Sequence, residues 1–356
     1  MDNLILIISS TIFCFFITLK LTPIALFIGE KKGLDDWPNT RKQHEKPKVR
    51  IGGISITVSF LIGMTTLYLL NIFNFYEVNF SYEILVLIFC SLIMFLIGIS
   101  DDIFNLNPFL RLFIQIIATS IIWAAGIRID SLDLNQLNLP IIQFPVFVNY
   151  ILTVFWIVGV VNAINWIDGL DGLAAGITSI TTLSFIVISI CSGNLSYTLL
   201  SSCLLGGNIG FLILNKYPSQ IMMGDGGSYF LGFVLSIMAI KNFSVIENMN
   251  MQFEIIYPII FMSIPLFDMI YVIFKRISNG KSIFFPDRSH IHHRLIDLGF
   301  NHPKSVNYIL IWVCWFNITG LLGYFIKINS LIIFFVSSIL FYFFNKRIIN
   351  SIVFNN

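Results

Sequence analysis

Charged residues are scarce in this 356-residue chain, where Asp, Glu, Lys and Arg together make up 11% of the sequence. Soluble domains carry roughly 25%, so this composition excludes an ordinary soluble protein. The five cysteines all lie in apolar segments without metal-binding or redox spacing, and we interpret them as small core residues. Low-complexity segments, repeats and soluble domains are also lacking, which predicts a single membrane domain over residues 1–356.

Long apolar runs dominate the sequence, which is 56% hydrophobic. A membrane-spanning helix needs about 20 mostly apolar residues. The runs have almost no polar face, unlike helices of soluble proteins, and they do not alternate like the strands of a transmembrane barrel. We therefore expect an all-α polytopic membrane protein with about eleven transmembrane helices, the first of them too long for a signal peptide. The candidate segments are 3–27, 52–73, 83–100, 109–127, 148–166, 171–191, 197–214, 228–245, 253–274, 306–326 and 330–345.

Basic residues are unevenly divided between the two sides that these segments define. The connections after the first, third, fifth, seventh and ninth segments, together with the C-terminal tail, hold 17 of the 21 Lys and Arg residues. Cytoplasmic loops carry an excess of Lys and Arg. The pattern predicts that this side faces the cytoplasm, with the N-terminus outside and the C-terminus inside.

The unusual polar motifs all fall on that same side, which predicts an active site built from cytoplasmic loops. Polar loops are expected wherever a chain meets water, but five clusters enriched in Asp, Asn and His on one face are not. The longest loop on the other side, around 128–147, alternates like a small β-hairpin. The five motifs are DDWPNTRKQHEKPKVRIGGI (35–54), SDDIFNLNPFLRL (100–112), NAINWIDGLDGLAAGI (162–177), NKYPSQIMMGDGGS (215–228) and FPDRSHIHHRL (285–295).

Aspartates are the commonest reactive groups in these motifs. Asn165 and Asp168 would share a helix face, and Gly169 and Gly172 are expected to break the helix and turn the next aspartate inward. Several carboxylates on one face repel each other unless a cation joins them. Oxygen ligands without cysteine indicate Mg²⁺, with Mn²⁺ as the alternative, rather than zinc. The aspartates concerned are Asp101, Asp102, Asp168, Asp171 and Asp225.

The histidine motif allows two interpretations. Three histidines invite a zinc site, but only His290 and His293 share a helical face and no cysteine is near. Because Arg288 and Arg294 flank them, we favour a clamp for phosphate or pyrophosphate. Asp268 lies inside an apolar segment, where a carboxylate is a functional candidate; its alternative role is to pair with a nearby basic group.

Taken together and in order, the motifs resemble the polyprenyl-phosphate N-acetylhexosamine-1-phosphate transferases, relatives of the phospho-N-acetylmuramoyl-pentapeptide transferases. The HIHH form is similar to the N-acetylhexosamine branch, whose members have eleven helices. The matching pieces are Asp36-x-Pro38-x-x-Arg41-Lys42-x-His44, Arg50-x-Gly52-Gly53, Asp101-Asp102, Pro108-x-x-Arg111-Leu112, Gln115, Asn162-x-x-Asn165-x-x-Asp168-Gly-Leu-Asp171-Gly-Leu, Gly224-Asp225-x-Gly227-Ser228 and Asp287-Arg288-x-His290-x-His292-His293.

The resemblance implies a reaction and a place in the cell. A UDP-activated N-acetylhexosamine, with GlcNAc as the default sugar, gives its sugar-1-phosphate to undecaprenyl phosphate and UMP leaves. This step begins the synthesis of a cell-surface polysaccharide such as O-antigen at the bacterial inner membrane. The implied partners are the UDP-sugar, undecaprenyl phosphate and membrane lipid, but not nucleic acid; a homodimer is left open.

The resemblance also implies a role for each matched residue. Asp225, Asp171 and Asp168 would hold Mg²⁺, and Asp101 and Asp102 would position, and could deprotonate, the prenyl phosphate. The remaining candidate residues would bind substrate; among them Asp268 is a candidate because it lies inside an apolar segment, not because of the resemblance. They are Asn162, Asn165, Asn215, Arg288, His290, His292, His293, Arg41, Lys42, His44, Arg50, Arg111, Asp36 and Asp268.

A membrane transporter of nucleotide sugars or organic anions is the rival class. Transporters tend to place their binding residues near the membrane midplane, on broken helices in repeated halves. In this sequence the acidic residues lie at one membrane face and no corresponding halves are visible. The enzyme interpretation is therefore favoured. The sequence leaves the sugar and the prenyl length open.

Overall fold

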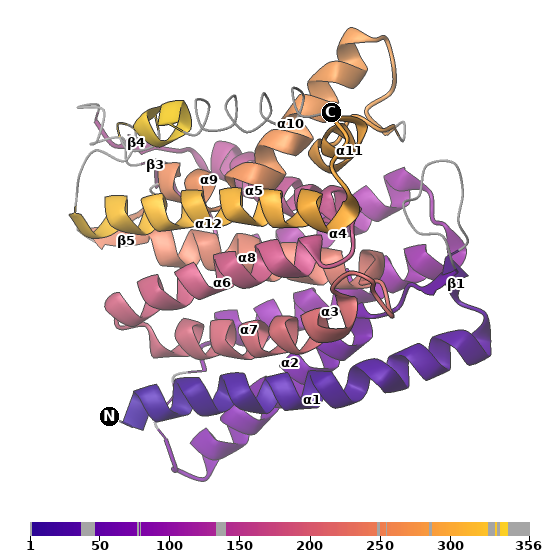
Figure 1. Cartoon of the computed structure of the whole chain (residues 1–356). Helices are drawn as coiled ribbons and strands as arrows, with labels where there is room; N and C mark the ends of the chain where they lie inside the picture. The colour runs from indigo at the N-terminus through magenta and orange to yellow at the C-terminus, as the bar shows by residue number, and fades with distance from the viewer. Residues whose placement is uncertain are drawn as a thin grey trace.

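The computed structural model describes residues 2–36, 47–76, 78, 80–132, 140–247, 250–253, 255–284, 287–326, 332 and 335–340. Within these residues the chain is mainly helical (Figure 1). Its helices are α1 (Asp2–Lys32), α2 (Gly53–Ile72), α3 (Tyr82–Phe104), α4 (Pro108–Ala124), α5 (Val146–Ile167), α6 (Leu173–Cys191), α7 (Leu195–Asn215), α8 (Gly224–Phe243), α9 (Ile256–Phe261), α10 (Ser263–Ser278), α11 (Ile291–Asp297) and α12 (His302–Ile326).

The apolar runs of the sequence are helical wherever the structure describes them. Seven of the helices, α1, α2, α3, α5, α6, α7 and α12, are long and apolar enough to cross a membrane by length and composition. The helix α4 is apolar but shorter. The predicted run at 330–345 lies mostly outside the described residues. The class of helical membrane protein is therefore confirmed, whereas the number of eleven crossings stays a prediction.

Helix α8 forms the centre of the bundle. Nearly all its side chains are buried, and it packs against α3, α5, α2 and α6 (Figure 1). Its contact with α3 is very close, since a Cβ atom on Gly98 would lie 2.4 Å from the carbonyl oxygen of Asp225. Only glycine permits that approach, and it brings the aspartates near the end of α3 against the beginning of α8.

One predicted segment, 253–274, is not a single helix. The structure divides it into α9 and α10 at Met262 and places its first residue in a strand. Pro265 lacks the backbone N–H that would bond to the carbonyl of Phe261. Asn317 Nδ2 donates to that carbonyl at 3.2 Å instead, and Thr181 Oγ1 does so at 3.5 Å. The prediction of one continuous helix was wrong because the proline breaks its hydrogen-bond ladder.

Short strands cover the two ends of the bundle. Near the motif-bearing end, β1 (Asp35–Asp36) pairs with β2 (Lys48–Val49), which returns the chain toward α2. At the other end, β3 (Ser131–Leu132) and β4 (Ile142–Gln143) form the predicted hairpin, whose tip lies outside the described residues. Two strands that the sequence did not indicate, β5 (Ser244–Glu247) and β6 (Asn250–Phe253), extend it into a sheet of order β4-β3-β6-β5.

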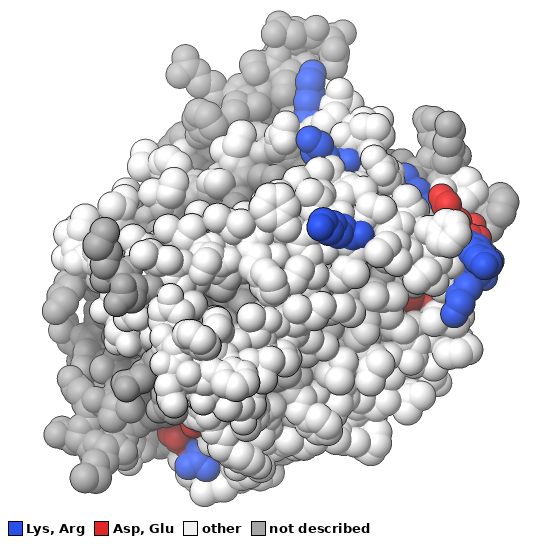
Figure 2. Space-filling view, turned by 90° about the horizontal axis from the view of Figure 1, so that it is seen from below, with Lys and Arg blue, Asp and Glu red and all other residues white. Residues whose placement is uncertain are grey.

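Charged side chains are rare on the face of the bundle that Figure 2 shows. Most of that face is uncharged, and the densest group of charged residues lies on the side where β1 lies in Figure 1. Large apolar side chains such as Phe27, Phe89 and Phe155 are exposed instead. An apolar surface of this kind suits a lipid environment, because lipid tails do not penalise exposed apolar side chains as water does.

Candidate functional site

Asp101, Asp102 and Asp225 meet where the last turn of α3 contacts the first turn of α8. Asp102 accepts hydrogen bonds from the backbone N–H groups of Asp225 at 3.0 Å and Gly226 at 3.1 Å. A carboxylate is stabilised at a helix N-terminus because the first N–H groups have no partner within the helix. Asp102 therefore caps α8 from a neighbouring helix, and its side chain is 2% exposed.

Two arginines lie between these carboxylates. Arg50 Nε is 3.1 Å from Asp102 Oδ1, and its Nη2 is 2.7 Å from Asp225 Oδ1. Arg111 Nη1 donates to Asp101 Oδ2 and lies 3.8 Å from Asp225 Oδ2. Two guanidinium groups thus face three aspartate side chains. Both arginines and all three aspartates were predicted site residues.

The two predicted asparagines of α5 point to different neighbours. Asn165 Nδ2 donates to Asp225 Oδ1 and to Ser228 Oγ, both at 2.9 Å, so Asn165 belongs to the carboxylate cluster. Asn162 Nδ2 donates to Gln115 Oε1 of α4 at 2.9 Å. Asn162 therefore holds α5 against α4, and the structure does not place it against the carboxylates.

Asp171 lies in the turn between α5 and α6 and is held by Lys48. Lys48 Nζ contacts both carboxylate oxygens, at 3.0 and 2.7 Å, and also Ser219 Oγ at 2.8 Å. The backbone N–H of Ser219 donates to Asp171 Oδ2 at 3.0 Å. Burial alone would raise the pKa of the Asp171 carboxyl, but the hydrogen bonds from Lys48 and Ser219 hold it below its usual value.

Asn215 and His302 fix the backbone of the same turn. The N–H of Gly172, whose φ is +79°, donates to Asn215 Oδ1 at 3.0 Å. Asn215 Nδ2 in turn donates to the carbonyl of Ile221 at 2.8 Å. The N–H of Asp171 donates to His302 Nε2 at 3.2 Å. Asn215, predicted to bind substrate, is thus buried and uses its amide to shape the turn.

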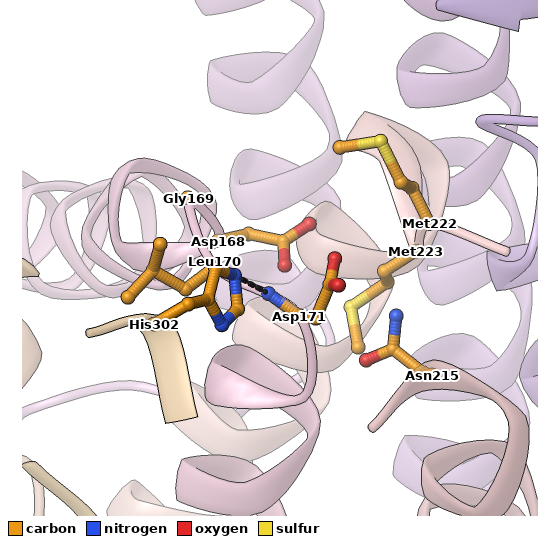
Figure 3. A pocket seen from close by; sticks show the side chains of 8 residues that line it. All are labelled: Asp168, Gly169, Leu170, Asp171, Asn215, Met222, Met223 and His302. Atoms are coloured by element: carbon orange, nitrogen blue, oxygen red, sulfur yellow. Dashed lines mark hydrogen bonds between the residues drawn. The ribbon is translucent and has the colours of Figure 1, made fainter. Parts of the chain in front are cut away.

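A small open pocket lies beside this turn (Figure 3). In Figure 3 the carboxylates of Asp168 and Asp171 point into the same space. Burial raises the pKa of the Asp168 carboxyl to about 7. Arg50 lowers this pKa, whereas the charges of Asp225 and Asp171 add to the rise. The remaining lining residues are Gly169, Leu170, Asn215, Met222, Met223 and His302.

The histidine motif packs against this turn from the other side. His292 is 2% exposed, and a Cβ atom on Gly169 would lie only 2.2 Å from its Nε2. Burial, followed by the neighbouring His293, His290 and His302, holds the pKa of His292 well below its usual value. His292 is therefore uncharged at neutral pH and serves as a packing residue under the turn. Its Nδ1 is buried without a hydrogen-bond partner among the described residues.

The other residues predicted to form the clamp have different surroundings. His290 Nδ1 lies 2.8 Å from Asp268 Oδ2, within hydrogen-bond distance. Burial and then the nearby Arg288 lower the pKa of His293. Arg288 is 44% exposed and pairs with Asp297 at 3.3 Å on the surface. The four clamp candidates thus share one loop and one short helix, but His290 and Arg288 pair with different carboxylates, those of Asp268 and Asp297.

The described residues contain no group of three or more His, Cys, Asp or Glu side chains arranged to hold a metal ion. A Mg²⁺ ion needs fewer protein ligands, because it is commonly held by one or two carboxylates together with substrate phosphates. Asp168 and Asp225 supply carboxylate oxygens, and burial, with the neighbouring charges of Asp225 and Asp171 adding to it, raises the pKa of Asp168. This donor set fits Mg²⁺.

Some predicted residues cannot be placed, and others were missed. Arg41, Lys42 and His44 lie outside the described residues, as does the side chain of Asp36. Lys48 was missed, although it stands two residues before Arg50, the spacing that puts side chains on one side of an extended segment. Ser219 and His302 were also missed, since each is a single polar residue without a pattern around it.

Comparisons with known proteins show which sequences the chain is similar to. Residues 84–242 match the model of glycosyl transferase family 4. The chain is 33% identical over 306 residues to a probable undecaprenyl-phosphate N-acetylglucosaminyl 1-phosphate transferase of Bacillus subtilis, covering 86% of the chain and 81% of the relative. It is 33% identical over 300 residues to the undecaprenyl-phosphate alpha-N-acetylglucosaminyl 1-phosphate transferase of Haemophilus influenzae, covering 82% and 78%. It is 29% identical over 316 residues to the decaprenyl-phosphate N-acetylglucosaminephosphotransferase of Mycobacterium tuberculosis, covering 83% and 77%.

Proposed function

The chain belongs to glycosyl transferase family 4, and on that basis we propose that it transfers N-acetylglucosamine 1-phosphate from a UDP-sugar to a polyprenyl phosphate. The names of relatives covering most of the chain support this sugar and this kind of acceptor. Undecaprenyl phosphate is the proposed acceptor, because two of these three relatives are named for it. The product would begin a cell-surface polysaccharide.

The observation that carries this proposal is the position of the cluster of Asp101, Asp102, Asp225, Arg50 and Arg111. These residues come from segments far apart in the sequence and meet at the ends of apolar helices. A lipid phosphate in the membrane and a soluble nucleotide sugar can meet only at such a boundary. A group transfer between them needs charged side chains that align two phosphate groups, which this cluster supplies.

The contacts of Asp101 and Asp102 favour direct attack without a strong base. Asp101 is engaged by Arg111 and by the N–H of Leu106 at 2.8 Å, and Asp102 is engaged by Arg50 and the beginning of α8. The second pKa of a phosphate monoester is near 6, so the acceptor is already mostly a dianion at pH 7. Its oxygen attacks the sugar-bearing phosphorus of the donor, the pyrophosphate bond breaks, and UMP leaves with the electron pair.

Mg²⁺ belongs to the same proposal. Asp168 and Asp225 are the residues that would hold it, together with donor phosphates, and Asn165 supports Asp225 through its hydrogen bond of 2.9 Å. When bound, the ion neutralises the charge that develops on the phosphate oxygens. Asp171 is engaged by Lys48 at 2.7 Å, which makes it a support of the turn in this structure.

Purified protein in detergent gives the decisive test of this function. With Mg²⁺, undecaprenyl phosphate and a panel of UDP-sugars, we expect UMP release that requires the lipid and is fastest with UDP-GlcNAc. Chelation by EDTA should abolish it, and added Mg²⁺ should restore it. Detergent leaves no compartment to transport into, so a transporter would release no UMP. If no UDP-sugar in the panel gives UMP release, the proposal is overturned.

The membrane orientation is tested separately. We propose that the site faces the cytoplasm of a bacterial inner membrane, as the distribution of basic residues predicts. In a variant without its five cysteines, single cysteines are introduced at the exposed positions Lys304 and Ser192. A membrane-impermeant thiol reagent should reach position 192 in intact cells and position 304 only in inverted vesicles. Labelling of both from one side would contradict this orientation.

A further inference from the structure

Asp268 of α10 is an acidic residue that the transfer reaction does not use directly. Its side chain is 2% exposed, and both its oxygens are occupied. Oδ2 accepts from His290 Nδ1 at 2.8 Å, and Oδ1 accepts from the backbone N–H of Ile291 at 2.6 Å. Arg294 lies 3.7 Å from Oδ1 and stacks over Tyr271. A carboxylate buried in this way is closed to a substrate.

The contact with Asp268 fixes which nitrogen of His290 carries a proton. An ionised carboxylate only accepts hydrogen bonds, so Nδ1 must be the donor. The second nitrogen, Nε2, has no hydrogen-bond partner among the described residues. It is therefore the atom of the ring that can bond to a ligand or exchange a proton with one.

Neighbouring rings hold His290 in one orientation. The ring lies edge-on to Trp166, with centroids 5.9 Å apart, and parallel to His292 at 5.5 Å. Trp166 follows Asn165, which bonds to Asp225. Arg276 lies over the face of Trp166 at 4.8 Å. The placement of His290 is thus linked through α5 to the residues that would hold the phosphates.

We propose that Asp268 is a positioning residue: it fixes the tautomer and orientation of His290, whose Nε2 then contacts the diphosphate of the donor sugar nucleotide. This inference rests on the proposed function. It also assigns Asp268 a role other than the substrate contact expected from the sequence. A carboxylate partner sets which nitrogen of a histidine is available, and for metal-bound histidines losing that partner typically costs about 10- to 100-fold in metal affinity or activity.

Asp268→Asn is the most direct test. Asparagine can still accept from Ile291, but its amide must then donate to His290 Nδ1, which forces the proton onto Nε2. We expect kcat to fall about 10- to 100-fold, with little change in KM for the prenyl phosphate and in melting temperature. Asp130→Asn, the same substitution at the opposite end of the bundle, serves as the matched control and should behave like the wild type.

A double-mutant cycle separates positioning from a direct or merely structural role. If Asp268 acts only through His290, then Asp268→Asn should lower kcat no further in a His290→Ala background. Multiplicative losses would overturn the inference, as would a His290→Ala variant with wild-type kinetics. Wild-type turnover is measured first, so its absence would count against the proposed function rather than against this pair.

Nitrogen NMR of the wild type keeps the inference testable even if Asp268→Asn does not fold. The chain has five histidines, and the signal of His290 is the one lost in His290→Gln. At pH 8 we expect a protonated Nδ1 and an unprotonated Nε2 for this residue. Addition of a UDP-sugar should shift Nε2 but not Nδ1. A proton on Nε2 in the ligand-free protein would refute the assignment.

Discussion

Gly169→Ala should push the His292 side chain away from the turn between α5 and α6 that carries Asp168 and Asp171. The added Cβ would lie 2.2 Å from His292 Nε2 and 2.5 Å from Cε1, whereas a relaxed contact is about 3.5 Å. The ring must therefore retreat by roughly 1 Å, although His292 is 2% exposed and has little room. Overpacking of this kind typically costs about 1–3 kcal/mol. A displacement of about 1 Å in a catalytic site can cost about 100-fold in rate.

The assay is lipid-dependent UMP release with both substrates varied, together with the melting temperature. We expect kcat to fall by about one to two orders of magnitude with a small drop in melting temperature. Gly159→Ala in α5 is the matched control, because the nearest atom to its Cβ, Met269 Cε, is 4.0 Å away. In a His292→Ala background the clash is removed, so Gly169→Ala should add little. Wild-type kinetics for Gly169→Ala would refute the reasoning.

Three further substitutions and conditions test the site. Asp225→Asn keeps the size of the side chain but removes the charge opposite Arg50. Turnover should be almost abolished while expression is preserved. Normal Mg²⁺ dependence in this variant would exclude Asp225 as a metal ligand. Lys48→Met leaves the nearly buried Asp171 unpaired, which typically costs about 3–5 kcal/mol; a melting temperature equal to that of the wild type would show that the ion pair is dispensable. The pKa of His292 is lowered in the folded state, so the unfolded chain binds more protons below pH 6.5. The free energy of unfolding should therefore fall by up to about 1.4 kcal/mol per pH unit as the pH decreases from 6.5. The fall should be smaller in His292→Gln.

Much of the site could be read from the sequence because its residues stand in recognisable local motifs. The paired aspartates 101 and 102, the Asn165 to Asp171 series, the glycine-rich segment around Asp225 and the histidine motif were all identified before the structure, and the structure brings them to one end of the bundle. Apolar runs of about 20 residues determined the helical membrane class, since hydropathy depends only on local composition.

Only the tertiary structure decided which groups pair with one another. The ion pair of Lys48 with Asp171 joins residues 123 positions apart, and the bond between Arg50 and Asp225 spans 175. Asp268 and His290 lie on different elements, and no spacing in the sequence indicates that they meet. A charge buried at a helix end takes whichever partner the packing of other helices brings within hydrogen-bond distance, and that packing is not encoded in any local pattern.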